Sequence, residues 1–424
     1  MRKYLKQVTG TGEAASEQST MATVRQMVRE IAENRDAAVR RYAKELDGWE
    51  RDSFRVPRSR IEQVTKRLPT TFKEDFKFAR RQVTEFARRQ RESLSEFEVE
   101  VGDGITLGQR LIPVSAVGCY IPGGKYPLIS AAIMSIGTAK VAGVDTVIAC
   151  APPRDKEGIF AYSLYAMDAC GADEIYELGG VQALAAMAYG CIGMAPVDML
   201  VGPGNAYVSG AKRELFGVVG IDLLAGPTEI CIIADDTADA QLVAADLLGQ
   251  AEHGPDSPAW LITTSEDLGK AVLGEIDIQL ASLPSADIAG QAWRERGEVV
   301  VVGSDDEAVA LSDEYAPEHL EVMTRHLDYY LAHLRNYGSL FLGEESTVAY
   351  GDKAVGTNHT LPTGKAARYT GGLSVGNFIK TVTYQRLTPR ASRKIAPVVS
   401  NICDAEGMAG HKKTADIRIT RYGR

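Results

Sequence analysis

Four of the six histidines lie in dense polar stretches, which makes them the first candidates for chemistry. They are His253 in GQAEHGPDS, His319 in YAPEHLEV, His359 in GTNHTLP and His411 in EGMAGHKK. A single histidine is usually a core or surface residue. Four in such settings indicate a joint site, because imidazole is both a common metal ligand and a common general base. The remaining two, His326 and His333, lie in a stretch with helical spacing and are expected on the surface.

Gln250 and His253 lie three residues apart at the end of an expected helix, which Gly254-Pro255 must terminate. Both therefore fall on one face and can present an amide oxygen and an imidazole to one cation. The alternative is a helix C-cap, where the dipole favours histidine in any case. Asp352 and His411 would complete a mixed nitrogen and oxygen set without thiolate. Such a set suits zinc, manganese or a similar metal and leaves positions for substrate.

Glu318 and His319 are adjacent at the start of an apolar, strand-like run, directly after Pro317. Neighbours on a strand point to opposite faces, so both can serve one cleft only at a strand end or a turn. There, one of the two could handle a hydroxyl proton and the other a water molecule. An exposed polar turn is the alternative interpretation.

The elements that must position these residues form two tandem α/β patterns. From Ala116, apolar runs alternate with Gly or Pro turns and Ala-rich helical stretches; the runs are AVGCYI, VDTVIAC, DEIYEL and VDMLVG. After Gly226 the pattern begins again with ICIIAD, AWLITTS, EVVVVG, LEVMT and GSLFLG. Such alternation predicts βαβ units and parallel sheets.

The expected fold class is therefore α/β, with two tandem Rossmann-like parallel-sheet domains. We expect a helical N-terminal segment over residues 1–107, a first α/β domain over 108–226, a second over 227–385 and a small helical C-terminal tail over 386–424. Within the N-terminal segment, apolar residues recur at helical spacing from Val24 to Ile31 and again from Phe72 to Arg91, and residues 97–113 alternate like a β insert.

Composition excludes several classes of protein. The 424 residues carry 47 Lys and Arg against 56 Asp and Glu, a net charge of −9, and this acidic balance argues against a nucleic-acid partner. No secretory signal and no window of roughly 18 apolar residues is found, so a soluble, cytosolic protein without a membrane partner is expected. The six cysteines are scattered without a CxxC pair and are expected to be buried free thiols.

A GxGxxG fingerprint does not follow the first α/β strand, where YIPGGKYP offers the comparable Gly-rich turn. Backbone N–H groups at this turn or at GPGN would have to hold phosphates instead. The spacing of residues alone predicts an α/β enzyme and leaves its metal dependence and its substrate open.

Nine segments, taken together, resemble the histidinol dehydrogenase family. They are VGCYIPGGKYPL, AGVDTVIACAPP, LGGVQALAAMAYG, VDMLVGPGNAYV, GIDLLAGPTE, LLGQAEHGPDS, YAPEHLEV, GTNHTLPT and EGMAGHKK. They run in family order from Val117 almost to the C-terminus. The resemblance implies a zinc- and NAD-dependent enzyme that oxidises a primary alcohol through an aldehyde to a carboxylate and consumes two NAD. It also implies a homodimer with intertwined domains.

The resemblance also implies a role for each matching position. The zinc ligands would be Gln250, His253, Asp352 and His411. His319 would act as general base and Glu318 would activate the water that hydrates the aldehyde. The NAD contacts would be Tyr120, Gln182 and Asn205, and the substrate contacts Thr228, His359 and Glu406. Glu406 and His411 would complete the partner subunit's site, so an isolated monomer would be inactive.

Some positions depart from the family's histidinol enzymes. Thr228 replaces a common Ser, and the stretch KAARYTGGLSVGNFIKTVTYQ resembles the branch that oxidises sulfopropanediol (2,3-dihydroxypropane-1-sulfonate) to sulfolactate. A sulfonate is anionic and favours Lys or Arg, and Lys365 and Arg368 follow His359 closely. The alternative for these two cations is surface charge on a loop.

Three hypotheses for function follow from the sequence. The first is oxidation of sulfopropanediol. The second is oxidation of L-histidinol, whose ammonium and imidazole favour carboxylates, and Glu406 is retained. The third is a catalytically silent homologue that binds a metal or a metabolite.

Overall fold

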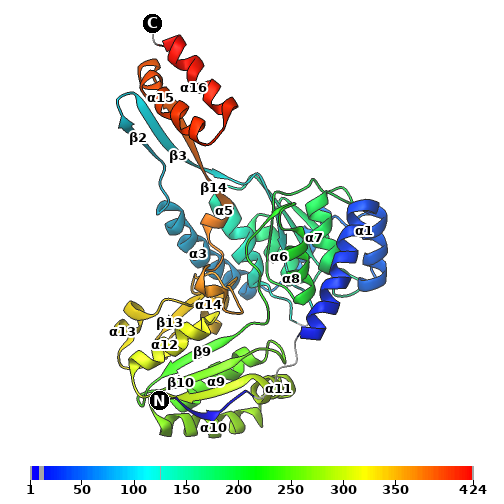
Figure 1. Cartoon of the computed structure of the whole chain (residues 1–424). Coiled ribbons are helices and arrows are strands. Elements are labelled where there is room, and N and C mark those ends of the chain that lie inside the picture. The colour runs from blue at the N-terminus through cyan, green and yellow to red at the C-terminus, as the bar shows by residue number, and fades with distance from the viewer. Residues whose placement is uncertain (1, 9–13, 125, 423–424) are drawn as a thin grey trace.

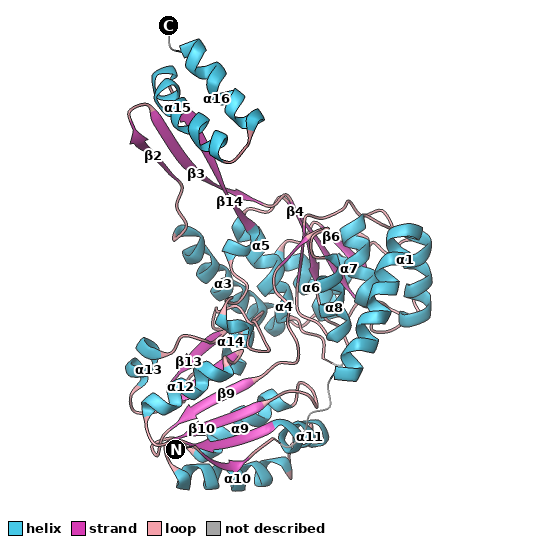
Figure 2. Cartoon of the chain, viewed as in Figure 1, coloured by secondary structure: helices cyan, strands magenta, loops and turns pink. Residues whose placement is uncertain are grey.

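The computed structural model describes residues 2–8, 14–124 and 126–422, which form two α/β units and one projecting arm (Figures 1 and 2). The first unit is built on a five-stranded sheet and the second on a six-stranded sheet. The arm contains a three-stranded antiparallel sheet and two helices. The predicted α/β fold with two tandem parallel-sheet units is confirmed.

The first sheet is parallel throughout and has the strand order β6-β5-β4-β7-β8. Its strands are β4 (Ala116–Tyr120), β5 (Thr146–Ala151), β6 (Glu174–Glu177), β7 (Met199–Val201) and β8 (Gly220–Ile221). The helices between them are α4 (Ser130–Ala132), the π-helix η1 (Ile133–Gly137), α5 (Thr138–Ala142), α6 (Ala161–Cys170), α7 (Gly180–Tyr189) and α8 (Ala206–Leu215). The chain reverses direction across the sheet between β4 and β7, where open α/β sheets bind ligands.

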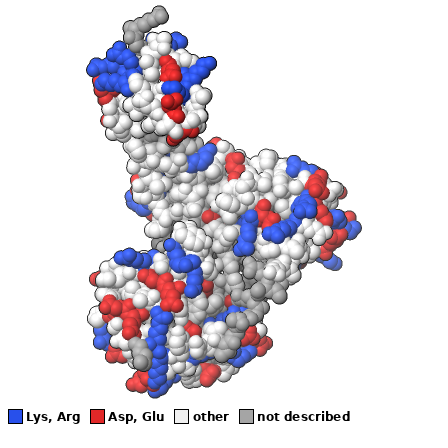
Figure 3. Space-filling view, in the orientation of Figure 1, with Lys and Arg blue, Asp and Glu red and all other residues white. Residues whose placement is uncertain are grey.

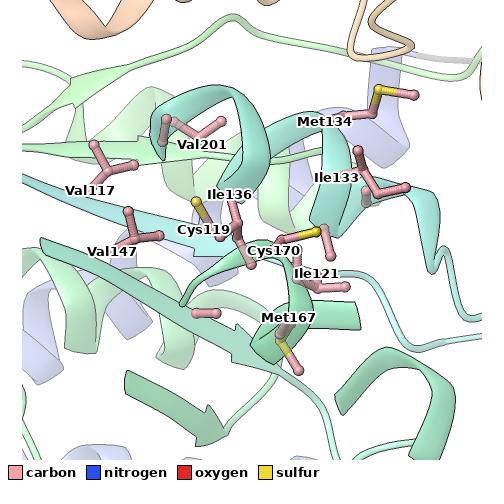
Figure 4. Packing of buried hydrophobic residues seen from close by; sticks show 14 of the residues in the cluster. Val117, Cys119, Ile121, Ile133, Met134, Ile136, Val147, Met167, Cys170 and Val201 are labelled. Atoms are coloured by element: carbon pink, nitrogen blue, oxygen red, sulfur yellow. The ribbon is translucent and has the colours of Figure 1, made fainter. Parts of the chain in front are cut away.

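Helices cover both faces of the first sheet, which explains why its strands are apolar on both sides. On one face, Cys119 and Val147 pack with Ile136 and Met167 (Figure 4). On the other face, α1 (Ala14–Asp47) packs against α7 and α8. The N-terminal segment also contains α2 (Arg58–Arg67) and α3 (Thr70–Glu92). Val24 is fully buried, as its helical spacing predicted.

The second sheet has the order β1-β11-β10-β9-β12-β13 and is parallel except for its edge strand β1. Its strands are β1 (Lys3–Lys6), β9 (Ile230–Ala234), β10 (Ala259–Thr263), β11 (Gly297–Val301), β12 (His319–Met323) and β13 (Ser339–Leu342). Its helices are α9 (Ala240–Ala251), α10 (Glu266–Leu280), α11 (Ala286–Arg296), α12 (Asp305–Tyr315), α13 (Leu327–His333) and α14 (Val348–Lys353). The five parallel strands coincide with the apolar runs predicted from the sequence.

The arm joins segments that are far apart in the sequence. The β insert predicted at 97–113 forms β2 (Phe97–Gly102) and β3 (Ile105–Pro113), and β3 pairs along its whole length with β14 (Ile379–Leu387). The helices α15 (Pro389–Ala405) and α16 (Ala409–Tyr422) follow, and two 3-10 turns, η2 (Ala366–Arg368) and η3 (Val375–Phe378), precede β14.

Three strands, β1, β3 and β14, do not respect the expected domain boundaries. β1 lies within the N-terminal segment that we expected to be helical, yet it pairs with β11 of the second sheet. The expected boundary at 107/108 falls inside β3, and the boundary at 385/386 falls inside β14. Both boundaries therefore cut through the arm, whose third strand, β14, the sequence pattern did not reveal.

Several simpler expectations can be compared with the structure. All six cysteines are buried free thiols, as predicted. Among the described residues, no helix is long and apolar enough to span a membrane. On the face shown in Figure 3, Lys and Arg side chains are interspersed with Asp and Glu. His326 and His333 are exposed at the two ends of α13, as expected.

Candidate active site

The catalytic pair implied by the resemblance lies at the amino end of the second sheet. β12 begins at His319, Glu318 directly precedes it, and His319 aligns with Ile230, the first residue of the neighbouring strand β9. Glu318 and His319 are both buried. The strand-end position predicted for the pair is therefore confirmed, and the alternative of an exposed turn is wrong.

Hydrogen bonds from the turn before β9 fix the Glu318 carboxylate. Its Oε2 accepts hydrogen bonds from the Thr228 hydroxyl (2.5 Å) and from the backbone N–H of Glu229 (3.0 Å). Gln250, near the end of α9, donates from Nε2 to the Thr228 hydroxyl at 2.5 Å. Since the amide nitrogen is occupied in this way, the oxygen Oε1 is the atom of Gln250 that suits a cation.

The orientation of His319 leaves one ring nitrogen for chemistry. Nδ1 lies 3.1 Å from the carbonyl oxygen of Glu229, so the proton on Nδ1 can be donated there. Nε2 is buried, has no hydrogen-bond partner among the described residues and lies 3.8 Å from Oδ1 of Asp352. Burial disfavours the charged ring, but the Glu318 and Asp352 carboxylates raise the pKa of His319 well above its ordinary value. The ring is therefore strongly basic, and Nε2 is the nitrogen at which it gains or loses a proton.

Asp352 lies close enough to His253, His319 and His359 to interact electrostatically with each of them. Burial opposes ionisation of Asp352, but His319, His359 and Lys353 together lower its pKa below the ordinary value. The His253 ring is accessible at the surface, yet the protein packed around it lowers its pKa, and burial likewise lowers the pKa of His359. At neutral pH Asp352 is thus ionised and the His253 and His359 imidazoles are neutral, which are the forms that bind a metal ion.

This donor set fits zinc only in part within one chain. Gln250, His253 and Asp352 are brought together, but His411 lies on α16 and Glu406 at the end of α15, both exposed on the arm. Figure 1 shows α15 and α16 at the far end of the arm, away from β9 and α14. Across the described ranges, no three His, Cys, Asp or Glu side chains of this chain gather closely enough to hold a metal ion.

The residues implied for NAD lie at the carboxyl edge of the first sheet. Tyr120 ends β4, and its hydroxyl accepts a hydrogen bond from the N–H of Gly180 at the start of α7 (3.2 Å). Burial raises the pKa of Tyr120 to about 12, so the phenol stays protonated. Asn205 follows β7 and caps α8 by accepting from two backbone N–H groups, which is also sufficient to explain an Asn there.

Gln182 presents an acceptor at the same edge. Its Nε2 donates to Oδ2 of Asp47 at the end of α1 (2.9 Å), while its Oε1 is buried without a donor among the described residues. An orphaned acceptor of this kind suits a bound group that donates a hydrogen bond. Lys125, which belongs to the Gly-rich turn YIPGGKYP, lies outside the described residues.

A buried ion pair fixes the backbone at the end of β7, at this same edge. The ammonium of Lys212 on α8 pairs with Asp222 and donates to the carbonyl of Gly202 at 3.0 Å. Asp222 in turn accepts a hydrogen bond from the N–H of Gly202 (2.9 Å). Gly202 has a φ of 127° and lies so close to Tyr120 that a Cβ at Gly202 would be 2.2 Å from the Tyr120 carbonyl oxygen. Only glycine fits at this position.

The two edges are joined by the loop after α14. Nε2 of His359 lies 3.1 Å from the hydroxyl of Ser130 on α4, and Asn358 donates to the carbonyl of Met134 at 2.9 Å. The carboxyl edge of the first sheet therefore meets the amino edge of the second sheet at this loop. The residues implied for NAD lie at the first of these edges, and Glu318 and His319 lie at the second.

Lys365 and Arg368 lie on the next part of this loop and are exposed. The loop is fastened to the turn that carries Thr228: the Thr363 hydroxyl accepts from the N–H of Gly226 (2.5 Å), and the N–H of Gly364 donates to Oε1 of Glu229 (3.2 Å). The two cations are thus carried by a fixed segment beside the site.

Comparison with known proteins decides the family. The family model described as histidinol dehydrogenase matches residues 11–419. The chain belongs to the histidinol dehydrogenase family. It is 52% identical over 425 residues to a protein named histidinol dehydrogenase homolog from Shouchella clausii, with 100% of both chains covered. It is 46% identical to sulfopropanediol 3-dehydrogenase from Ruegeria pomeroyi, over 99% of this chain and 97% of that one.

The fold agrees with a solved structure of the same family. The crystal structure of histidinol dehydrogenase from Elizabethkingia anophelis superposes with a TM-score of 0.89 at 34% identity and covers 99% of this chain and 95% of that chain. Members of the histidinol dehydrogenase family are NAD-dependent oxidoreductases and are generally zinc-dependent as well. The protein is therefore an NAD-dependent dehydrogenase.

Two residues of this dehydrogenase site were not identified from the sequence. Glu229 is buried, and burial together with the nearby Glu318 raises its pKa to about 8. An acidic residue directly before the apolar run of β9 was a usable signal for it. Asp47 gave no signal, since it ends a charged helix and its partner Gln182 is 135 residues away.

Proposed function

We propose that the protein uses NAD and zinc to oxidise a primary alcohol to a carboxylate through an aldehyde, and that its substrate is (R)-2,3-dihydroxypropane-1-sulfonate, with sulfolactate as product. The observation that favours this substrate is the attachment of the loop carrying Lys365 and Arg368 to the turn at Thr228. A sulfonate anion needs such cations, and Arg binds it through paired N–H groups. The 46% identity to sulfopropanediol 3-dehydrogenase supports the same assignment.

The zinc ion would be held by Gln250, His253 and Asp352 together with His411 of the partner subunit. When bound, zinc would polarise the substrate hydroxyl and make its proton more acidic. His319 receives this proton at Nε2, because its Nδ1 faces the carbonyl of Glu229. Tyr120, Gln182 and Asn205 would hold NAD, which would accept the hydride from the alcohol carbon and so leave an aldehyde.

The second oxidation requires a water molecule. Glu318, held by Thr228 and the N–H of Glu229, takes a proton from the water that adds to the aldehyde. A second NAD would accept the hydride from the hydrated aldehyde, which would leave the carboxylate. Thr228, His359 and the partner subunit's Glu406 would contact the substrate, with Lys365 and Arg368 at its sulfonate end.

The arm provides the reason to propose a homodimer. The apolar side chains exposed on it are those of Phe97, Val99, Val101, Leu107, Ile395, Val398, Val399, Ile402, Met408 and Ile417. Ten exposed apolar side chains on one small arm mark an interaction site. A second copy that covers it would bring Glu406 and His411 to a site that lacks them.

L-histidinol is the second candidate substrate, favoured by the presence of Glu406, a carboxylate that suits its ammonium or imidazole. The deciding experiment offers both alcohols in parallel to zinc-loaded protein at saturating NAD and follows NADH by absorbance. We expect turnover with sulfopropanediol. Turnover with histidinol alone would refute the sulfonate assignment, and no NADH with either would refute the proposed activity.

The double variant Lys365→Ala/Arg368→Ala tests the sulfonate contact directly. It should raise KM for sulfopropanediol by roughly ten- to a hundredfold, the cost of losing hydrogen bonds to a charged group. The matched control removes two exposed cations remote from the site, Lys66→Ala/Arg67→Ala on α2, and should leave KM unchanged.

A further inference from the structure

Glu321 is a fully buried acid one pleat beyond His319. Residues two apart on a strand share a face, so Glu321 lies on the same side of β12 as His319. Its Oε1 accepts a hydrogen bond from the N–H of Val348, the first residue of α14, at 2.7 Å. Its Oε2 is buried and has no donor among the described residues. A buried carboxylate oxygen without a donor requires an explanation.

Asp246 lies opposite, on α9, one turn before Gln250. Its Oδ1 accepts from the Thr347 hydroxyl at 2.9 Å, and the same hydroxyl accepts from the N–H of Ala349 as the cap of α14. Because their partners Thr347 and Val348 are adjacent, the carboxyl groups of Asp246 and Glu321 meet at the start of α14, close enough for each to affect the ionisation of the other. Both therefore bind the first turn of α14, one through a backbone N–H group and the other through the cap.

Two carboxylates that face each other are both acceptors, so contact between them requires a proton or a cation. Within the described ranges neither Asp246 nor Glu321 forms an ion pair with Lys, Arg or His, and no third acidic ligand joins them. A single proton satisfies both groups. In agreement, burial raises the pKa of each carboxyl group above its ordinary value.

We propose that Asp246 and Glu321 are positioning residues that share one proton and thereby lock α9, β12 and α14 together. Each of these elements carries one residue of the proposed centre: Gln250 on α9, His319 on β12 and Asp352 on α14. The inference rests on the proposed zinc site and adds to it the device that sets the spacing of its ligands. Supporting residues of this kind tune metal affinity because they fix the orientation of the ligands.

The test measures zinc affinity of the full-length protein by competition with a chelator. Glu321→Leu removes the shared proton and the acceptor for Val348, and zinc affinity should fall by roughly ten- to a hundredfold. Glu321→Gln should restore it to within about threefold of wild type, because a neutral amide can accept from Val348 and donate to Asp246. Asp246→Ala, at a partly exposed position, provides a second truncation should the leucine variant fail to fold.

A matched control uses Glu298, a buried acid on β11 of the same sheet that accepts a hydrogen bond from Tyr315. Glu298→Leu should leave zinc affinity unchanged. Wild-type affinity in Glu321→Leu, or equal losses in Glu298→Leu and Glu321→Leu, would overturn the positioning role. Equal losses in Glu321→Gln and Glu321→Leu would overturn the shared proton and indicate a bound cation instead.

A second readout separates this inference from the proposed function. Hydrogen exchange of the backbone amides of α14, measured without metal, should accelerate in Glu321→Leu and stay slow in Glu321→Gln. If wild-type protein binds no zinc, the proposed zinc site fails, while the exchange pattern still decides whether the pair fastens α14. Unchanged exchange in Glu321→Leu would overturn the pair as a lock.

Discussion

His319 has the geometry of a proton acceptor, and this leads to the first prediction. Its Nδ1 lies 3.1 Å from the Glu229 carbonyl, and its Nε2 is buried without a partner among the described residues. His319→Asn should reduce turnover by at least about a hundredfold, the usual contribution of general acid–base catalysis. Steady-state assays and metal analysis check it: zinc content should stay at the wild-type level, and lost zinc would mean that His319 is a ligand.

Glu318 supports a prediction about the order of steps. In Glu318→Gln the amide oxygen can still accept from the Thr228 hydroxyl and the N–H of Glu229, so the fold should persist. The amide cannot take a proton from water. Oxidation of the aldehyde should therefore slow more than oxidation of the alcohol, as measured by single-turnover assays started from each compound. Equal slowing of both half-reactions would remove this role from Glu318.

His359 supports a prediction about pH. Burial lowers its pKa from the ordinary 6.5, so the unfolded chain binds more protons than the folded chain as the pH falls through 6.5. Stability must therefore decline on acidification below pH 6.5, by up to about 1.4 kcal/mol per pH unit for one group. Urea unfolding of chelator-treated protein between pH 7 and pH 5 should show a smaller decline in His359→Gln than in wild type. An identical decline would show that His359 is not desolvated.

At the scale of single elements, the end of α1 orients a side chain of α7 through one hydrogen bond. Asp47 accepts a hydrogen bond from Nε2 of Gln182, which leaves Oε1 of Gln182 without a donor among the described residues. Asp47→Ala should raise KM for NAD by about tenfold and change kcat less, because the Gln182 side chain proposed to contact NAD is then no longer held in one orientation. Steady-state kinetics with varied NAD measure this. Asp36 lies on the same helix and accepts a hydrogen bond from the N–H of Ile192. Asp36→Ala should leave KM unchanged, and an equal rise would assign the effect to loss of α1 itself.

The elements also show which parts of the fold are predictable from the sequence. Strands buried on both faces, such as β9 and β12, form continuous apolar runs and were all predicted. β14 was not, because its residues alternate between exposed and half-buried positions in the arm, and β1 is only four residues long. The Glu318 and His319 pair was found because a strand start next to Pro317 is a local signal. The junction of the two sheets was not, since it depends on contacts such as Ser130 to His359, 229 residues apart.

At the scale of the whole molecule, the distribution of the proposed ligands predicts an exchange of arms between two copies. Gln250 and Asp352 lie on α9 and α14 of the second unit and His253 follows α9, while Glu406 and His411 belong to α15 and α16, which Figure 1 shows at the far end of the arm. The exposed stripe Ile395, Val398, Val399 and Ile402 recurs at helical spacing on α15. A closed dimer covers such a stripe on both copies at once.

Complementation of two inactive variants tests this arrangement most sharply. His319→Asn disables the central part of one site, and His411→Ala disables the arm that serves the other copy. If arms are exchanged, a mixed dimer contains one site with both residues intact, so co-expression should restore about a quarter of wild-type activity on random pairing. Co-expression of His319→Asn with Asp352→Ala, both in the central part, should restore none. Equal failure of both pairs would mean that each arm serves its own chain, because only exchange between copies can rebuild an intact site.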